Sequence, residues 1–187
     1  MFKRLFDIVA ALLGLALFGL PMLVVAAWIR LDSPGPVFFR QVRVGRHGKV
    51  FRIHKFRTMS VDAERRGPQL TVGDDARVTR VGRVLRANRL DELPQFLDVL
   101  AGDMSLVGPR PERPEFVELF DAQIRRYGER HRVKAGVTGW AQVNGLRGQT
   151  SIADRAEWDN YYIENWSVAL DIKILALTVL AVMRRAE

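Results

Sequence analysis

The sequence contains no cysteine, and this absence removes several classes of protein at once. Without thiols the chain can form no disulfide framework, no thiolate zinc site and no cysteine nucleophile. Histidine is scarce as well, because His47, His54 and His131 are too few and too scattered to indicate a histidine metal cluster. Hydrophobic residues nevertheless make up 48% of the chain and charged residues 27%. This composition excludes an acidic disordered or low-complexity chain and indicates a folded protein.

Acidic residues are fewer than basic residues in this sequence. The chain has 29 lysines and arginines against 21 aspartates and glutamates, a net charge of +8. A basic protein of this kind is expected to have an anionic partner, such as nucleic acid, a phospholipid surface or a phosphorylated substrate. At 187 residues the chain has room for one domain, or for one domain with an appendage.

One long stretch has no charge at all, namely the 22 residues from Ile8 to Ile29. About 20 apolar residues are enough to cross a bilayer as a helix, so a single spanning helix is the plain interpretation. A cleavable signal peptide fits less well, because its apolar region would be shorter and a small-residue cleavage site would follow it.

Two features of this stretch favour a different course through the membrane. Pro21 lies inside it, and proline removes a helix hydrogen bond and kinks the helix. Basic residues also flank both ends, at Lys3, Arg4, Arg30, Arg40, Arg43 and Arg46. A spanning helix cannot keep both ends on the cytoplasmic side, whereas a helix that bends at Pro21 and returns can do so. The alternative is therefore a re-entrant, helix-break-helix anchor over residues 1–31, followed by a catalytic domain over residues 32–187.

The rest of the chain has an α+β pattern. Residues 37–44 and 50–56 are rich in β-branched and aromatic side chains and predict a small hairpin, with residues 45–48 as the turn. No acidic residue occurs from Ser33 to Val61, so this basic segment is expected to face anionic headgroups or phosphates. Apolar spacing predicts helices over 79–100, 114–133 and 153–166. Residues 168–183 predict a core helix or an interfacial amphipathic one, and residues 136–150 a glycine-rich irregular segment.

Asp91 and Glu92 form an adjacent carboxylate pair in a basic neighbourhood. Such a pair is often only the acidic first turn of a helix, and residues 90–94 have the pattern of a helix start. The functional alternative is a carboxylate nucleophile or an oxygen ligand for Mg²⁺. Arg86 and Arg89 nearby would keep the pair ionised and could bind a phosphate.

Two further segments are candidates for ligand contact. Arg110 stands between Pro109 and Pro111, whose restricted backbones hold it on a stiff turn. A rigid guanidinium suits bidentate phosphate recognition, although an exposed turn arginine is an equal interpretation. Residues 136–148 place four glycines around Gln142, Asn144 and Arg147. Glycine permits close approach of a ligand, whereas the alternative is an ordinary surface loop.

Taken in order, these motifs resemble the bacterial sugar transferases, specifically the monotopic polyprenol-phosphate phosphoglycosyl transferases. The resemblance covers essentially the whole chain. It runs through Lys3–Ile8, Pro34–Phe38, Lys55–Met59, Leu90–Gln95, Gly102–Pro111, Gly136–Gly145, Tyr161–Ser167 and Leu170–Ile174. The family's re-entrant anchor is broken at a Ser-Pro pair. Here Leu20-Pro21 stands at that place, so the hinge proline is kept and the serine is missing.

The resemblance implies an enzyme that transfers a sugar-1-phosphate from a UDP-sugar to undecaprenyl phosphate and releases UMP. The reaction would proceed through a covalent enzyme-phosphosugar on the cytoplasmic face of the bacterial inner membrane, as the first step of surface polysaccharide synthesis. The expected nucleophile is Asp91, with Glu92 as its partner and Mg²⁺ as the cofactor, bound at Asp91. The expected substrate-binding residues are Lys55, Arg86, Arg110, Gln142, Asn144, Arg147 and Asp159.

Residues 146–150 and 164–167 resemble the branch that handles hexose-1-phosphates, so UDP-glucose or UDP-galactose is the expected donor and an N-acetylated sugar the alternative. Because larger members of this branch carry additional N-terminal membrane helices, the chain is expected to be either a short natural enzyme or an excised catalytic unit. The expected partners are the two substrates and membrane lipids, with no nucleic acid, and a homodimer is left open.

Three alternatives come from other classes of protein. A membrane-tethered nucleic-acid-binding module would use the basic hairpin, although no recognition helix or aromatic RNA platform accompanies it. An ordinary glycosyltransferase would release UDP instead of UMP. A non-catalytic scaffold for glycan assembly would have no need of the Asp91-Glu92 pair.

Overall fold

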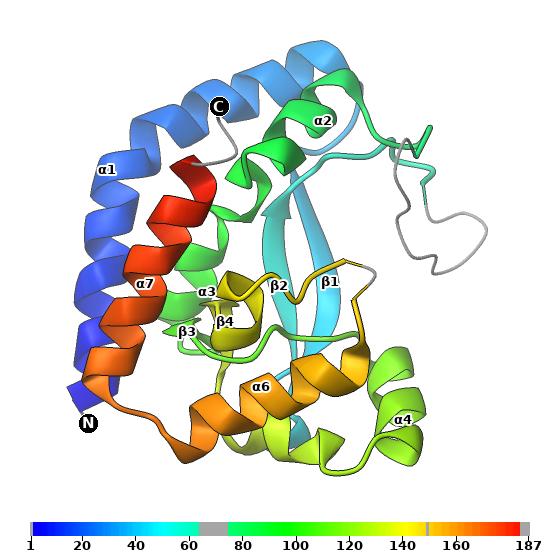
Figure 1. Ribbon diagram of the computed structural model, residues 1–187. Coiled ribbons are helices and arrows are strands. Elements are labelled where there is room, and N and C mark those ends of the chain that lie inside the picture. The colour runs from blue at the N-terminus through cyan, green and yellow to red at the C-terminus, as the bar shows by residue number, and fades with distance from the viewer. Residues whose placement is uncertain (1, 64–74, 149, 184–187) are drawn as a thin grey trace.

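The computed structural model describes residues 2–63, 75–148 and 150–183 of the 187-residue chain. Within these ranges helices alternate with two small sheets, each of two strands. The α+β class is therefore confirmed. Figure 1 shows a hairpin in the middle of the molecule with helices on several sides, and the long N-terminal helix forms one flank.

Helix α1 (Phe2–Asp32) continues through Pro21 without a gap. The predicted division into two helices is therefore not seen. Instead, α1 bends, running up one side of the molecule and then across its top (Figure 1). A proline inside a helix favours such a bend, because its ring crowds the carbonyl of the preceding turn. The re-entrant course and the boundary between residues 31 and 32 stay predictions.

Most of α1 faces outward. Its most apolar 18-residue window has a mean hydropathy of 2.6, and only 11% of that window is buried within the protein. The exposed large residues are Phe2, Leu5, Val9, Leu12, Leu13, Leu17, Leu20, Leu23, Val24, Trp28 and Leu31. The helix is thus long and apolar enough to enter a membrane, and its outer face has the composition of a lipid-contacting surface.

The inner side of α1 joins both hydrophobic clusters of the protein. Ala11 packs in one cluster with Val99, Met104 and Ile174 among its members. Further along, Ile29 belongs to a second cluster that includes Phe56, Val81 and Leu85. Because both halves of α1 pack against the remainder of the chain, the helix is part of the fold rather than a detached anchor.

The predicted hairpin is confirmed. Strand β1 (Phe38–Val44) pairs antiparallel with β2 (Val50–Phe56), with Phe38 opposite Phe56 and Val44 opposite Val50. A short 3₁₀ turn, η1 (Arg46–Gly48), connects the two strands. Side chains alternate along β2, so that Phe51 and Ile53 are buried in the core. Lys55 follows two residues later near the end of the strand.

A second sheet was not predicted, and one of its strands lies at the start of the segment expected to be irregular. Strands β3 (Met104–Val107) and β4 (Ala135–Thr138) pair in parallel, and every residue of β3 is buried. The glycines that indicated a loop are required for close packing, because a Cβ at Gly136 would overlap the backbone nitrogen of Gly108. The glycine-rich segment therefore begins as a strand and continues into the short helix α5 (Trp140–Val143).

The helix predicted over residues 79–100 is broken at its centre. It consists of α2 (Arg80–Ala87), the 3₁₀ turn η2 (Leu90–Glu92) and α3 (Gln95–Ala101). Arg89 lies in the left-handed region with φ of 57°, which ends the first helix. The helix predicted over 114–133 is likewise divided, into α4 (Pro114–Gln123) and η3 (Tyr127–Arg132).

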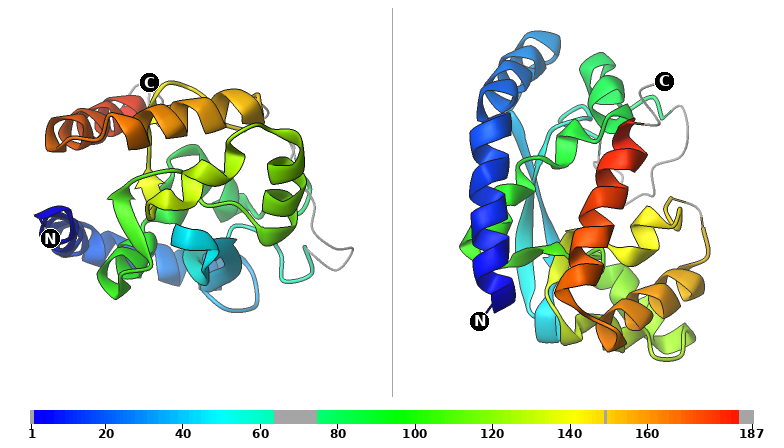
Figure 2. Two further views of the ribbon diagram at one scale, coloured as in Figure 1. Left: turned by 90° about the horizontal axis from the view of Figure 1, so that it is seen from below. Right: turned by 60° about the vertical axis from the view of Figure 1, so that its left-hand side comes forward.

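The last two helices occur where the sequence predicted them, as α6 (Ile152–Glu164) and α7 (Val168–Met183). The views of Figure 2 place α7 on the same flank as α1. The two helices meet at Asp171, a buried carboxylate near the start of α7 that Lys3 Nζ approaches to 2.7 Å. Asp171 also accepts hydrogen bonds from Tyr162 Oη at 2.7 Å and Trp166 Nε1 at 3.2 Å.

We expect Asp171→Ala to destabilise the protein, because the buried Tyr162 hydroxyl would lose an acceptor and the contact between α1 and α7 would be lost. Tyr162 Oη would keep only its bond to the Val107 carbonyl at 3.2 Å, and Trp166 Nε1 and Lys3 would lose their carboxylate partner. Losses of this kind cost about 1–3 kcal/mol, which corresponds to a fall in melting temperature of roughly 2–12 °C for a chain of this length. The measurement is thermal unfolding in detergent micelles, with Glu157→Ala on the exposed face of α6 as the control. Equal melting temperatures for the two variants would contradict the prediction.

Candidate active site

A polar pocket of about 210 Å³ lies beside the turn η2. Its walls come from η2, from the segment after β3, and from η3, α5 and α6. Six arginines line it: Arg86, Arg89, Arg110, Arg130, Arg147 and Arg155. Four carboxylates accompany them: Asp91, Glu92, Glu112 and Asp159. Arginines outnumber carboxylates, so the pocket is suited to an anionic ligand.

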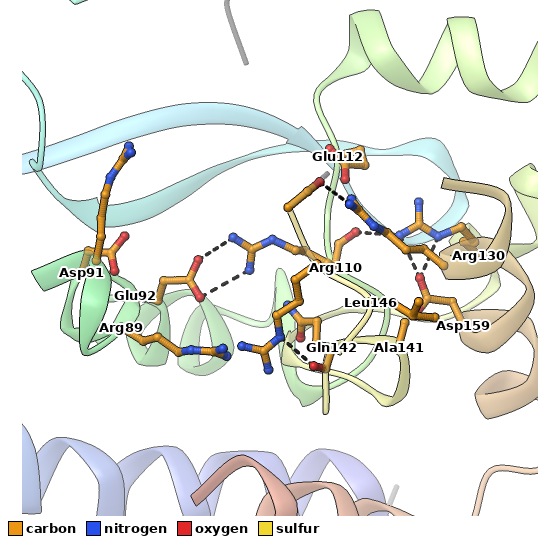
Figure 3. Close-up of a pocket in the computed structure, with 14 residues that line it drawn as sticks. Arg89, Asp91, Glu92, Arg110, Glu112, Arg130, Ala141, Gln142, Leu146 and Asp159 are labelled. Atoms are coloured by element: carbon orange, nitrogen blue, oxygen red, sulfur yellow. Dashed lines mark hydrogen bonds and ion pairs between the residues drawn. The ribbon is translucent and has the colours of Figure 1, made fainter. Parts of the chain in front are cut away.

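The turn η2 presents Asp91 and Glu92 to this pocket. Because the left-handed Arg89 ends α2 and Pro94 precedes α3, the two carboxylates stand on a tight turn between helices and not within a helix. Glu92 Oε1 accepts hydrogen bonds from Lys55 Nζ at 2.7 Å and from Arg110 Nη2 at 2.6 Å. Its second oxygen lies 3.3 Å from Arg110 Nη1, so the arginine binds the carboxylate with both arms (Figure 3).

The two neighbouring carboxylates differ in their electrostatics. Burial alone would raise the pKa of Glu92, but the charges and hydrogen bonds of Arg110 and Lys55 hold that pKa well below its usual range. The pKa of Asp91 is raised, first by burial and then by the charge of Glu92, while Lys55 and Arg110 oppose the rise. One carboxylate is thus firmly ionised by its partners, and the other is more easily protonated.

Hydrogen bonding separates the pair as well. Within the part of the chain that the structure describes, no donor binds the carboxylate of Asp91, although it lines the pocket. Glu92, by contrast, has both oxygens engaged. Of the two, Asp91 is therefore the carboxylate available to an incoming ligand.

Most of the other predicted substrate-binding residues also line the pocket. Arg86, in the last turn of α2, donates from Nε to Thr58 Oγ1 at 2.9 Å. Gln142 is buried, and its backbone carbonyl accepts a hydrogen bond from Arg147 Nε at 2.6 Å. This bond holds the loop after α5 against the helix and directs Arg147 along the pocket wall.

Three predicted residues have different surroundings. Lys55 contributes through its hydrogen bond to Glu92 and does not line the pocket itself. Asn144 is exposed and outside the lining, where its side chain donates to the Trp140 carbonyl at 2.8 Å at the end of α5. Asp159 lines the pocket, but its Oδ2 accepts a hydrogen bond from Arg130 Nε at 2.8 Å. This oxygen is therefore already engaged and is less available to bind a substrate.

Sequence reasoning missed Arg130, Arg155 and Glu112. Arg130 lies in a run with His131, Arg132 and Lys134 that has the composition of a solvated surface, although Arg130 itself is 5% exposed. The only local signal is that Tyr127 precedes it by three residues, and the tyrosine hydroxyl does accept from Arg130 Nη1 at 2.8 Å. Arg155 lies in a segment that was predicted only as a helix, with no motif around it. Its guanidinium binds backbone carbonyls of the loop before α6, among them Thr150 O at 3.0 Å.

The residues around η2 fit the Mg²⁺ ion that the motifs imply. Mg²⁺ in phosphate chemistry takes one or two carboxylates and completes its shell with water and substrate oxygens. Asp91 offers an unengaged carboxylate for this purpose, while Glu92 is occupied by cations. Among the described residues no group of three or more His, Cys, Asp or Glu side chains could form a cage made of protein alone. The fit is therefore to an ion that would be shared with the substrate.

The family model described as bacterial sugar transferase matches residues 1–185. The chain belongs to the bacterial sugar transferase family. It is 49% identical, over 97% of its length, to the UDP-N-acetylgalactosamine-undecaprenyl-phosphate N-acetylgalactosaminephosphotransferase of Aeromonas hydrophila. It is 48% identical, over 95% of its length, to the UDP-glucose:undecaprenyl-phosphate glucose-1-phosphate transferase of Escherichia coli K12.

The lengths of the relatives differ. The chain spans 43% of the Aeromonas relative and 39% of the Escherichia relative. It spans 87% of an uncharacterised sugar transferase of Bacillus subtilis, to which it is 47% identical over 97% of its own length. The residues described here therefore correspond to the sugar transferase unit that long and short relatives share.

We expect the Arg130–Asp159 pair to be sensitive to the loss of either partner, since both side chains are only 4% exposed. Asp159→Asn should lower the free energy of unfolding by about 3–5 kcal/mol, because it leaves a buried guanidinium without its counter-charge. Glu164→Gln on the same helix is the matched control. Glu164 pairs with Arg126 at the surface, where such a pair contributes less than about 1 kcal/mol. Denaturant unfolding of both variants tests this, and equal losses would contradict it.

Proposed function

We propose that this sugar transferase moves a sugar-1-phosphate from a UDP-sugar to undecaprenyl phosphate, giving undecaprenyl-diphosphate-sugar and UMP. The observation that carries the proposal is the difference between the paired carboxylates: Glu92 is neutralised by Lys55 and Arg110, whereas Asp91 is unengaged in an arginine-lined pocket. The activities for which the Aeromonas and Escherichia relatives are named support the same reaction class. The product would begin the assembly of a surface polysaccharide.

The charges of the pocket suit both substrates, which are phosphate anions. A volume of about 210 Å³ is below the roughly 300–1,000 Å³ typical of sites that enclose a whole drug-sized ligand. It is therefore suited to the diphosphate, with the uridine and the sugar extending beyond the arginines. Arg110 and Arg86 stand beside the carboxylate pair, where the positive charge of their guanidinium groups would offset the negative charge of the reacting phosphates.

The proposed chemistry has two steps. In the first, a carboxylate oxygen of Asp91 attacks the sugar-bearing phosphorus of the UDP-sugar, the bond from that phosphorus to the bridging oxygen breaks, and UMP leaves with the bond's electron pair. In the second, a phosphate oxygen of undecaprenyl phosphate attacks the same phosphorus, and the Asp91 carboxylate is released unchanged. Dividing the transfer in this way allows one pocket to serve a soluble donor and then a lipid acceptor.

The remaining residues control charge and orientation. Lys55 and Arg110 hold Glu92 ionised and in place, so that Glu92 supports the turn carrying Asp91. Mg²⁺, when bound by Asp91 and the substrate, would reduce the repulsion between the anionic reactants. Because burial raises the pKa of Asp91, the nearby cations are needed to keep its reactive form populated at neutral pH.

A hexose-1-phosphate is the proposed transferred group. UDP-glucose and UDP-galactose are the first donors to test, and the relatives named for glucose and for N-acetylgalactosamine support a panel that includes the N-acetylated sugar.

The proposed location is the cytoplasmic face of the bacterial inner membrane. The exposed apolar face of α1 supports membrane entry, and the basic residues at both of its ends support a course that enters and leaves on one side. Helix α7 lies on the same flank as α1 (Figure 2), and its residues Ile172, Val179 and Leu180 are exposed, so α7 is proposed to lie at the lipid interface.

The covalent step predicts a half-reaction. Enzyme mixed with a UDP-sugar and Mg²⁺, without lipid acceptor, should release UMP up to about one equivalent and gain the mass of a sugar phosphate. The adduct should map by mass spectrometry to the peptide containing Asp91. Asp91→Asn should abolish both signals, because an amide is a poor nucleophile.

Several outcomes of this experiment count against the proposal. Release of UDP would indicate an ordinary glycosyltransferase. UMP release that requires both substrates, with no adduct in the wild-type protein, would replace the covalent route by direct transfer. Glu92→Gln is the comparison variant, since it alters the neighbouring carboxylate while leaving the assigned nucleophile in place.

The re-entrant course predicts that both ends of α1 lie on the cytoplasmic side. The chain has no cysteine, so Phe2→Cys and Glu118→Cys each introduce a single label site, the second on the exposed side of α4. Both should react from the same side of the membrane with an impermeant maleimide. Labelling of position 2 from the opposite side would establish a spanning helix, and Pro21→Leu should shift some molecules toward that state.

A further inference from the structure

The segment Pro109–Glu112, which carries Arg110, is fixed in an unusual way. Its two prolines have no backbone N–H and so cannot contribute donors to a strand or a helix. The segment is held instead through its carbonyl oxygens, all four of which accept hydrogen bonds. The donors are Gly136 N to Pro109 O at 2.9 Å, Arg130 Nη2 to Arg110 O at 3.0 Å, Arg43 Nη1 to Pro111 O at 3.1 Å and Val44 N to Glu112 O at 2.9 Å.

Among these four donors, Arg130 is the one that binds Arg110 itself. Its Nη2 donates to the Arg110 carbonyl, and its Nε and Nη2 both lie 2.8 Å from Asp159 Oδ2. Its Nη1 donates to Tyr127 Oη at 2.8 Å, and its guanidinium stacks over the same ring at 4.9 Å. Every nitrogen of the Arg130 side chain therefore has a protein acceptor.

These contacts form a buried support between α6 and the reacting carboxylates. Arg130 and Asp159 are each 4% exposed at the side chain, and Tyr127 is fully buried. From Asp159 the contacts pass through Arg130 to the backbone of Arg110, and from the Arg110 side chain to Glu92 (Figure 3).

We infer that Arg130 is a positioning residue for the transfer reaction, acting through Arg110 and not on the substrate. The inference rests on the proposed function, because its effect is read as transfer. By binding the Arg110 carbonyl, Arg130 fixes the point from which the Arg110 fork extends to Glu92. Asp159 and Tyr127 in turn fix the plane of the Arg130 guanidinium, which assigns Asp159 a supporting role as well.

A lysine could not reproduce this arrangement. Its single ammonium could keep the ion pair with Asp159, but one nitrogen cannot reach acceptors that lie on three sides of a planar guanidinium. Arg130→Lys should therefore preserve the charge and leave the Arg110 backbone free to shift. Because a displaced group close to the reaction centre weakens transition-state contacts more than binding, the loss should fall on kcat.

The experiment measures UMP release with undecaprenyl phosphate and the UDP-sugar that the wild-type protein uses, per folded molecule. We expect Arg130→Lys to lower kcat by about tenfold, with KM for the donor changed less than about threefold. Arg110→Lys should lower kcat at least as much. In the Arg110→Lys background, adding Arg130→Lys should lower kcat by less than about threefold, because the two residues act as one unit. Arg132→Lys, an exposed arginine of the same turn, is the matched control.

A second variant covers the case in which Arg130→Lys does not fold. Replacing the whole pair, as Arg130→Met with Asp159→Leu, removes both buried charges together, and such replacements are often neutral or stabilising. This variant also lacks the donor to the Arg110 carbonyl and to Tyr127 Oη, so its melting temperature should fall somewhat, and each molecule that remains folded should show the same loss of kcat.

The outcomes are distinguishable. Wild-type kcat in a folded Arg130→Lys or pair-replaced protein would overturn the inference, as would a full tenfold loss repeated in the Arg110→Lys background. If the wild-type protein releases UMP, either of these two results would overturn the inference about Arg130 and leave the proposed function intact. A wild-type protein that releases no UMP with any UDP-sugar would contradict the proposed function, and this inference with it.

Discussion

The arrangement of the pocket depends on one shared carboxylate. Glu92 accepts hydrogen bonds from Lys55 on β2 and from Arg110 on the segment after β3, so it joins three parts of the chain that are far apart in sequence. Displacing either cation from this half-buried carboxylate would be costly, which makes the geometry of all three segments interdependent. This interdependence keeps the neighbouring Asp91 on a fixed turn without binding its oxygens.

The fold combines a large apolar surface with a strongly charged pocket. The outer face of α1 is a continuous apolar surface, whereas the pocket contains ten charged side chains within a small volume. Between them lie the hydrophobic clusters, in which Ala11 and Ile29 of α1 pack against the core and so place the apolar helix and the charged pocket in one rigid unit. Asp171 makes the same connection by polar contacts, because it ties the first turn of α1 to α6 and α7. The apolar helix and the charged pocket are therefore positioned relative to each other without a separate linker.

Sequence reasoning succeeded where structure is local and failed where it is not. The hairpin follows from two short segments rich in β-branched and aromatic residues, and α6 and α7 from the composition of short segments. The break in the helix predicted over 79–100 depends on a non-glycine residue, Arg89, in the left-handed region, which no local pattern indicates. The pairing of β3 with β4 joins segments about thirty residues apart through glycines that resemble a loop. The same limit applies in the pocket, where motifs located Asp91, Glu92 and Arg110 but a run of basic residues concealed the buried Arg130.

The two carboxylates of η2 illustrate how position, and not residue type alone, can divide a task. Both are acids on one short turn, yet Glu92 has the longer side chain and reaches two cations, while Asp91 remains short of them. Cations bound to Glu92 lower its pKa and reduce its nucleophilicity by occupying its lone pairs. The same cations, at greater distance, favour the ionised form of Asp91 without occupying its oxygens. Glu92 thus holds the two cations in place, and their positive charge favours the ionised form of Asp91.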